Sequence, residues 1–114
     1  MQQSALSPQF FCAVRPDRQR AIVRLTGELD LCAAPQVGAT VEDLLDAGFA
    51  QIVIDLRDLG FLDSAGVHTL VAAQRSAAQR GSALSAVRGS GHVHRVLELT
   101  ETDSVFAFDD GIDG

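Results

Sequence analysis

The sequence predicts an α/β fold, in which a small mixed β-sheet of about five strands packs against helices. Apolar runs of strand length alternate with segments whose apolar residues recur at helical spacing. The first two runs are separated only by a short charged turn, which predicts an antiparallel hairpin and makes the sheet mixed. The chain has 114 residues, which suits one domain with a buried core.

The segment from Gln51 to Arg80 organises the chain. Gln51–Leu56 is an apolar run that predicts a buried strand, and Leu59–Leu62 is expected to be a link. A helix packed on the sheet is then expected to start at Ser64, inside the motif Asp63-Ser-Ala-Gly. The apolar residues that recur at helical spacing behind it are Val67, Leu70, Val71, Ala77 and Ala78.

The other elements follow from the same patterns. Strands are predicted at Phe10–Val14, Ala21–Thr26, Ala83–Val87 and Val105–Phe108, with a charged loop over 15–20. A helix is predicted between Pro35 and Ala47, with a poor cap at Cys32 or Ala33 and Gly48 ending it. Ser90 is expected to cap a third helix. Residues 1–9 are expected to form a disordered N-terminus, 10–108 the domain, and 109–114 an acidic, flexible tail.

Composition and charge limit the possible functions. Apolar residues make up 46 % of the chain and charged residues 21 %, as in an ordinary globular protein. The formal charge of −6 argues against general binding to nucleic acid or anionic membrane, and leaves room for a basic protein partner. No apolar stretch reaches the ~18 residues that span a bilayer, and residues 1–8 lack the features of a secretory signal. The expected location is therefore cytoplasmic.

Ser64 is the strongest candidate for a functional residue. Serine is a good N-cap, and a helix start carries partial positive charge that favours anions. A phosphate on Ser64 would add about −1.5 to −2 charges and three acceptor oxygens without unfolding the domain. The alternative interpretation is that Ser64 only caps the helix.

The cysteines and histidines give weaker indications of a functional site. Cys12 and Cys32 lack metal-binding spacing and are expected to be reduced and structural, with a redox-sensing disulfide as the alternative. His92 and His94 are two residues apart on a predicted helix and therefore point in different directions, which disfavours a metal site. A hydrolase using Ser64 and His68 is disfavoured because both lie on one helix and Gly-x-Ser-x-Gly is absent. No cofactor, no metal and no enzymatic activity are expected.

Three blocks together resemble a known family. Leu25-Thr-Gly-Glu-Leu-Asp30, the segment 54–66 that contains Asp63-Ser-Ala-Gly, and Arg95-Val-Leu-Glu-Leu-Thr100 resemble a STAS domain, and more specifically the bacterial anti-sigma factor antagonists. The resemblance covers roughly residues 10–108, with the blocks in the family's order. It implies the same small mixed sheet with helices packed against it.

The resemblance also implies a function in transcription regulation. Members of this family are non-enzymatic switches that bind a cytosolic anti-sigma factor, typically a GHKL-type serine kinase, and thereby release a sigma factor. The kinase phosphorylates the motif serine, here Ser64, the phosphoprotein lets go, and a PP2C-like phosphatase resets it. Asp30 maps to an acid near that serine. The implied partner-binding residues are Asp30, Asp63, Ser64, Ala65, Gly66, Val67 and His68, with the helix surface at His68, Arg75 and Gln79 as a possible extension.

Some positions depart from the family pattern. Ala65 stands where a second serine is common, and Glu101 stands where a glycine commonly ends the third helix. The family's C-terminal helix is poorly supported by residues 109–114. The alternative function is a STAS module that is not phosphorylated and binds a small ligand or nucleotide, or acts as a scaffold in a larger signalling complex.

Overall fold

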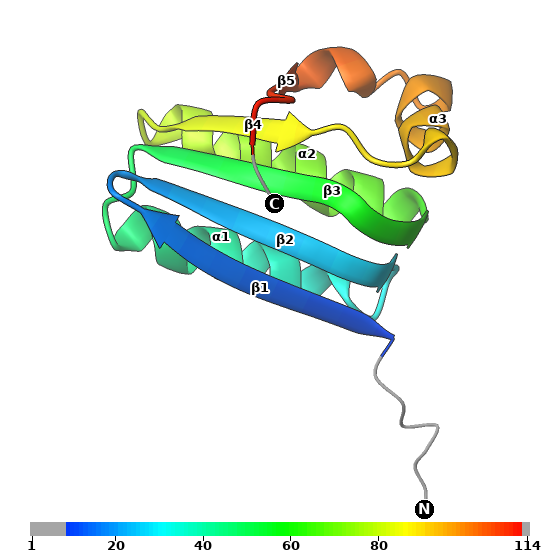
Figure 1. Cartoon of the computed structure of the whole chain (residues 1–114), viewed down its shortest axis with the longest axis horizontal. Helices are drawn as coiled ribbons and strands as arrows, with labels where there is room; N and C mark the ends of the chain where they lie inside the picture. The colour runs from blue at the N-terminus through cyan, green and yellow to red at the C-terminus, as the bar shows by residue number, and fades with distance from the viewer. Residues whose placement is uncertain (1–8, 113–114) are drawn as a thin grey trace, which may run out of the picture.

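The structure is a computed structural model that describes residues 9–112. Five strands form one sheet in the order β1-β2-β3-β4-β5 (Figure 1). β1 is antiparallel to β2, and the remaining neighbours are parallel, so the predicted mixed sheet is confirmed. The strands are β1 (Phe10–Asp17), β2 (Arg20–Leu29), β3 (Gln51–Leu62), β4 (Ala83–Val87) and β5 (Ala107–Phe108).

Helices α1 (Ala34–Asp46) and α2 (Ser64–Gln79) lie together on one face of the sheet, and α3 (Gly91–Leu99) lies beyond the end of β4 (Figure 1). Alternate residues of β3 point toward α1 and α2, as strand geometry requires. The main core joins these residues to the buried stripes of the helices, which include Val37 and Leu70. No helix within 9–112 combines the length and apolar character needed to cross a bilayer.

A smaller apolar cluster covers part of the opposite face. Ile22, Val53 and Val87 are buried there against Ile112. The amide of Asp109 also donates to the carbonyl of Ala86, at 2.8 Å. The prediction of a flexible tail from Asp109 is therefore wrong as far as Ile112, because this isoleucine closes an apolar surface left open by the helices. The last two residues, 113–114, and residues 1–8 lie outside the described part of the chain.

The hairpin is tighter than the sequence predicted. β1 continues to Asp17 and β2 begins at Arg20, so two residues make the turn instead of a loop over 15–20. Arg18 adopts a positive φ of 62°, the left-handed conformation that such short turns require. Pro16 is tolerated because β1 is an edge strand.

β3 is longer and β5 shorter than predicted. The region of Leu59–Leu62 continues β3 and pairs with β2 through two register shifts, one of them between Gly27 and Glu28. Such bulges let a strand continue where the regular apolar pattern is lost. At the other edge, a short 3-10 turn at Asp103–Val105 replaces the first part of the predicted last strand.

Both ends of α1 and the start of α3 follow the predicted chemistry. Ala33 gives α1 no side-chain cap, and Gly48 follows α1 with φ of 92°, both as predicted. Ser90 caps α3 by accepting from the Val93 amide at 3.4 Å. Glu101, at the position of the family's glycine, adopts the left-handed conformation itself, with φ of 59°.

Candidate functional site

The candidate site lies where β2 and β3 end side by side. Leu29 and Leu62 are the last paired residues of these parallel strands, so Asp30 and Asp63 leave the sheet next to each other. The amide of Asp63 donates to the carbonyl of Leu29 at 3.3 Å, which connects the two chain segments directly. The sheet thus brings together two acidic residues 33 positions apart in the sequence (63 − 30).

Asp63, not Ser64, is the N-cap of α2. Its backbone is extended, and its carboxylate accepts from the Gly66 amide at 2.9 Å. Ser64 is the first residue of the helix, and its side chain is exposed. The prediction that Ser64 starts the helix is confirmed, but the alternative interpretation, that Ser64 only caps the helix, is wrong. Asp63, one residue earlier, already accepts the hydrogen bond from the Gly66 amide in the first turn of the helix.

Asp30 organises the turn between β2 and α1. One of its carboxylate oxygens accepts from the amides of Cys32 and Ala33, both at 3.0 Å. Its backbone carbonyl accepts from the Ala34 amide at 2.9 Å. Asp30 therefore supplies the hydrogen bonds that Ala33 cannot supply to the start of α1, and its carboxylate is held at the edge of the site.

Two of the predicted partner-binding residues are buried. Val67 is 5 % exposed, and Gly66 packs so closely that a β-carbon there would lie 2.6 Å from the Leu29 carbonyl oxygen. This burial disfavours direct contact of Gly66 and Val67 with a partner, which stays an untested prediction. Gly66 allows the first turn of α2 to lie against the end of β2, and Val67 belongs to the core.

A shallow groove opens beside Ser64, and no pattern in the sequence indicated it. It has a volume of about 350 Å³ and is lined by Leu31, Ala34, Pro35, Gly38, Ala65, His68 and Thr69. We call it the Leu31 groove, because Leu31 is 73 % exposed at its edge. The groove joins residues of α1 and α2 that are far apart in the sequence, and the Thr69 hydroxyl connects the helices by donating to the Ala34 carbonyl at 3.2 Å.

The remaining predicted surface residues lie where a partner could reach them. Ala65 is partly buried at the groove, and His68 is exposed on the next turn of α2. Arg75 and Gln79 are also exposed, further along α2. The structure thus brings Ala65 and His68 together with Leu31. Gly66 and Val67 are buried beneath this surface, where they pack against the rest of the domain.

The two cysteines lie at different parts of the domain, Cys12 in β1 and Cys32 in the turn before α1. Cys12 contacts the Thr40 hydroxyl at 3.7 Å, and burial raises the pKa of the Cys12 thiol more than this contact lowers it. Cys32 is exposed in the turn before α1, whereas Thr40 lies six residues beyond Ala34, the first residue of α1 (40 − 34), a helical rise of about 9 Å. A disulfide requires α-carbons within about 7 Å, so this placement favours the prediction of two reduced thiols.

A second polar group lies away from Ser64, at α3. His94, Glu98 and Asp103 offer ligand atoms within 4.8 Å of one another. However, the Arg88 guanidinium lies 2.8 Å from Nε2 of His94 and stacks 4.4 Å from the centre of the Phe108 ring. A cation therefore already occupies this position, which disfavours a metal ion there. His92 is exposed and is not part of the group.

Comparisons with known proteins agree with this architecture. The family model described as "Mlab, STAS domain" matches residues 12–107. An anti-sigma F factor antagonist from Paenibacillus polymyxa is 29 % identical over 80 residues, covering 69 % of this chain and 68 % of that protein.

Solved structures of two further proteins share the fold. An anti-sigma factor antagonist from Mycobacterium paratuberculosis aligns with a TM-score of 0.80 and 24 % identity, over 91 % of this chain and 88 % of the other. The anti-sigma factor antagonist SpoIIAA in its unphosphorylated form aligns with a TM-score of 0.74 and 22 % identity, over 87 % of this chain and 88 % of the other. SpoIIAA from Bacillus in its phosphorylated form aligns with a TM-score of 0.68 and 20 % identity, over 87 % of this chain and 91 % of the other.

The chain has a mixed five-stranded sheet, with an exposed serine at the start of the helix that follows its central strand. The chain belongs to the STAS domain family.

Proposed function

We propose that this protein is an anti-sigma factor antagonist, a switch that binds an anti-sigma factor and is controlled by phosphorylation of Ser64. In its unphosphorylated form it sequesters the anti-sigma factor, a GHKL-type serine kinase, and a sigma factor is released. A PP2C-like phosphatase restores the active form. The protein acts in the cytoplasm and has no catalytic activity of its own.

The observation that carries this proposal is the position of the Ser64 hydroxyl. It is exposed at the first residue of α2, and the Gly66 amide is already bound by Asp63. A kinase can therefore modify Ser64 without removing the cap of the helix. Similarity to a named antagonist from Paenibacillus polymyxa supports the same role, as does the fold shared with SpoIIAA, a protein known in both phosphorylation states.

The Leu31 groove supplies the contact surface in this proposal. Leu31 is an exposed apolar side chain beside a concave, mainly apolar surface, which is the arrangement of an interface anchor. Asp30 and Asp63 lie nearby and would meet a basic partner surface. The direct contacts are assigned to Asp30, Leu31, Asp63, Ser64, Ala65 and His68.

Phosphorylation would disrupt such an interface by charge and by volume. A phosphate adds about −1.5 to −2 charges beside Asp30 and Asp63, and it occupies space at the groove. The loss of only about 2.8 kcal/mol of binding free energy lowers affinity a hundredfold. No rearrangement of the domain is needed, because Ser64 is exposed in the unmodified form.

The test is phosphorylation by the cognate kinase. The protein is incubated with ATP and the anti-sigma kinases encoded in the same genome, and the modified residue is mapped by mass spectrometry. We expect one phosphate, on Ser64, and none on Ser64→Ala. Modification of another residue, or of none by any cognate kinase, contradicts the proposal and favours a STAS module that binds a small ligand or acts as a scaffold.

A binding measurement completes the test. Ser64→Asp is expected to weaken binding to the kinase at least about tenfold while changing the melting temperature little, because the side chain is exposed and Asp63 remains the cap. The matched control is Ser104→Asp, an exposed serine in the 3-10 turn, which should leave binding unchanged. A large loss of melting temperature in Ser64→Asp would mean that Ser64 is primarily structural.

A further inference from the structure

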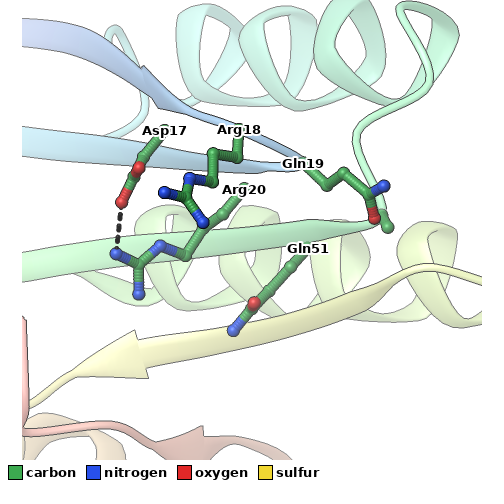
Figure 2. Close-up of a pocket in the computed structure, with 6 residues that line it drawn as sticks. Asp17, Arg18, Gln19, Arg20 and Gln51 are labelled. Atoms are coloured by element: carbon green, nitrogen blue, oxygen red, sulfur yellow. Dashed lines mark hydrogen bonds and ion pairs between the residues drawn. The ribbon is translucent and has the colours of Figure 1, made fainter.

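A second hollow lies at the opposite end of the sheet from Ser64. Its volume is about 610 Å³, and it is lined by Asp17, Arg18, Gln19, Arg20, Ala50 and Gln51 (Figure 2). Arg20 and Gln51 are the first paired residues of β2 and β3, whereas Leu29 and Leu62 are the last. The ten residues of β2 therefore separate this hollow from the Ser64 site by about 30 Å.

The backbone around this hollow is firmly held. The Gln19 carbonyl accepts from the amides of Ala50 and Gln51, at 3.0 and 3.3 Å, so the hairpin turn is bound to the start of β3. Arg18 is fixed in the left-handed conformation of the turn. Figure 2 shows the guanidinium groups of Arg18 and Arg20 facing the same space, with the Gln51 carboxamide nearby.

The local charge opposes the charge of the whole protein. Arg20 forms an ion pair with Asp17 at 2.5 Å, and the Asp17 carboxylate is the only acid among the residues that line the hollow. The hydrogen bond from Arg20 holds the pKa of Asp17 below its usual range, and the charges of Arg15 and Arg18 act in the same direction. Two guanidinium groups and one carboxylate therefore line the hollow, in a chain whose formal charge is −6.

We propose that this hollow is an oxyanion-binding site that takes the phosphate or pyrophosphate group of a small molecule. Guanidinium groups match the geometry of phosphate oxygens and bind them through two parallel hydrogen bonds. Arg18 and Arg20 provide these donors, and the Gln51 amide group provides a neutral donor beside them. The volume lies in the range of small-molecule sites. The site is independent of Ser64 and of the proposed switch.

The test is an NMR titration of the ¹⁵N-labelled protein with pyrophosphate at low ionic strength, with sodium chloride of equal ionic strength as the reference. We expect saturable shifts of the amides of Arg18, Gln19 and Gln51, with an apparent Kd of about 1 mM or tighter. Titration with ATP identifies the source of the group. Tighter binding of ATP indicates a nucleotide, and equal binding indicates the phosphate group alone.

Three variants separate this site from general charge effects. Arg18→Asn keeps a residue that tolerates the turn conformation but removes the charge, and it should weaken binding about fivefold or more. Asp17→Asn removes the competing carboxylate and should strengthen binding about threefold. Arg75→Gln, on the exposed surface of α2, should have no effect. Shifts no larger than with chloride, or equal loss of binding in Arg18→Asn and Arg75→Gln, would overturn the proposal.

Discussion

Gly66 lies directly against the carbonyl oxygen of Leu29, so close that a β-carbon on Gly66 would be 2.6 Å from that oxygen. This contact sets the distance between the first turn of α2 and the end of β2. Because Ser64 belongs to the same turn and Asp30 follows Leu29, the contact also positions the two sides of the candidate site.

Gly66→Ala should therefore destabilise the protein by about 2–3 kcal/mol, because backbone atoms cannot move away as a flexible side chain could. The measurement is urea unfolding followed by circular dichroism. Gly38→Ala is the matched control, since a β-carbon there meets only the Thr69 hydroxyl at 3.6 Å, an ordinary contact. It should be neutral or stabilising by up to about 1 kcal/mol. Equal stability of Gly66→Ala and the wild type would contradict the close contact.

Asp63→Ala should lower the free energy of unfolding by about 1 kcal/mol, the usual cost of losing an N-cap. Ser64→Ala should change it by less than about 0.5 kcal/mol, because the Ser64 side chain is exposed and Asp63 supplies the cap. Both values come from chemical unfolding at neutral pH. The reverse order of the two effects would mean that Ser64 is the capping residue.

Leu31→Ala should weaken binding to the anti-sigma factor by about tenfold or more, because an exposed apolar anchor loses its contact in the complex. The stability of the Leu31→Ala variant should differ little from that of the wild type, since the Leu31 side chain is 73 % exposed. Leu99→Ala is the comparison variant, because Leu99 is 69 % exposed on α3 and does not line the groove. Calorimetric titration distinguishes the two, and similar affinities would rule out the Leu31 groove as the contact surface.

Asp55 gives the stability a dependence on pH. Its side chain is only 1 % exposed, and it accepts two hydrogen bonds from the Arg57 guanidinium, at 3.0 and 2.9 Å. Burial by itself raises the pKa of Asp55, but the hydrogen bonds and the charge of Arg57 outweigh burial and lower it. Since the pKa is lower in the folded state, this stabilisation is present above about pH 4 and is lost as the pH falls through the folded pKa.

Asp55→Asn should thus cost about 3 kcal/mol at pH 7, and its stability should converge with that of the wild type in acid. Urea unfolding between pH 7 and pH 3 measures both curves. Asp46→Asn removes an exposed partner of Arg80 and should cost no more than about 1 kcal/mol. Parallel curves for wild type and Asp55→Asn would contradict the assignment.

Glu101→Gly should stabilise the protein by about 0.5–1 kcal/mol. Glu101 adopts a left-handed backbone with φ of 59°, which glycine adopts without steric cost. Glu98→Gly, inside α3, should instead destabilise it by about 1 kcal/mol. Thermal unfolding compares the two variants, and a lower melting temperature for Glu101→Gly would show that the side chain contributes more than the backbone conformation costs.

Local patterns predicted the elements well where one chemical feature dominates. Ala83–Val87 was predicted with the observed bounds because it is a short apolar run between two breaks. β3 was predicted too short, because its last part pairs through register shifts that depend on β2. Ile112 was missed because its burial depends on an apolar patch formed by three different strands.

The sequence by itself determined the alternation of strands and helices, the acidic charge, and the Asp63-Ser-Ala-Gly motif at the start of a helix, because each depends on residues close together in the chain. Only the tertiary structure decided that Asp63 is the cap, that Gly66 and Val67 are buried, and that Leu31 borders a groove between α1 and α2. Whether a side chain is exposed or covered depends on which distant segments pack against it, and the sheet register that joins Leu29 to Leu62 sets that packing here.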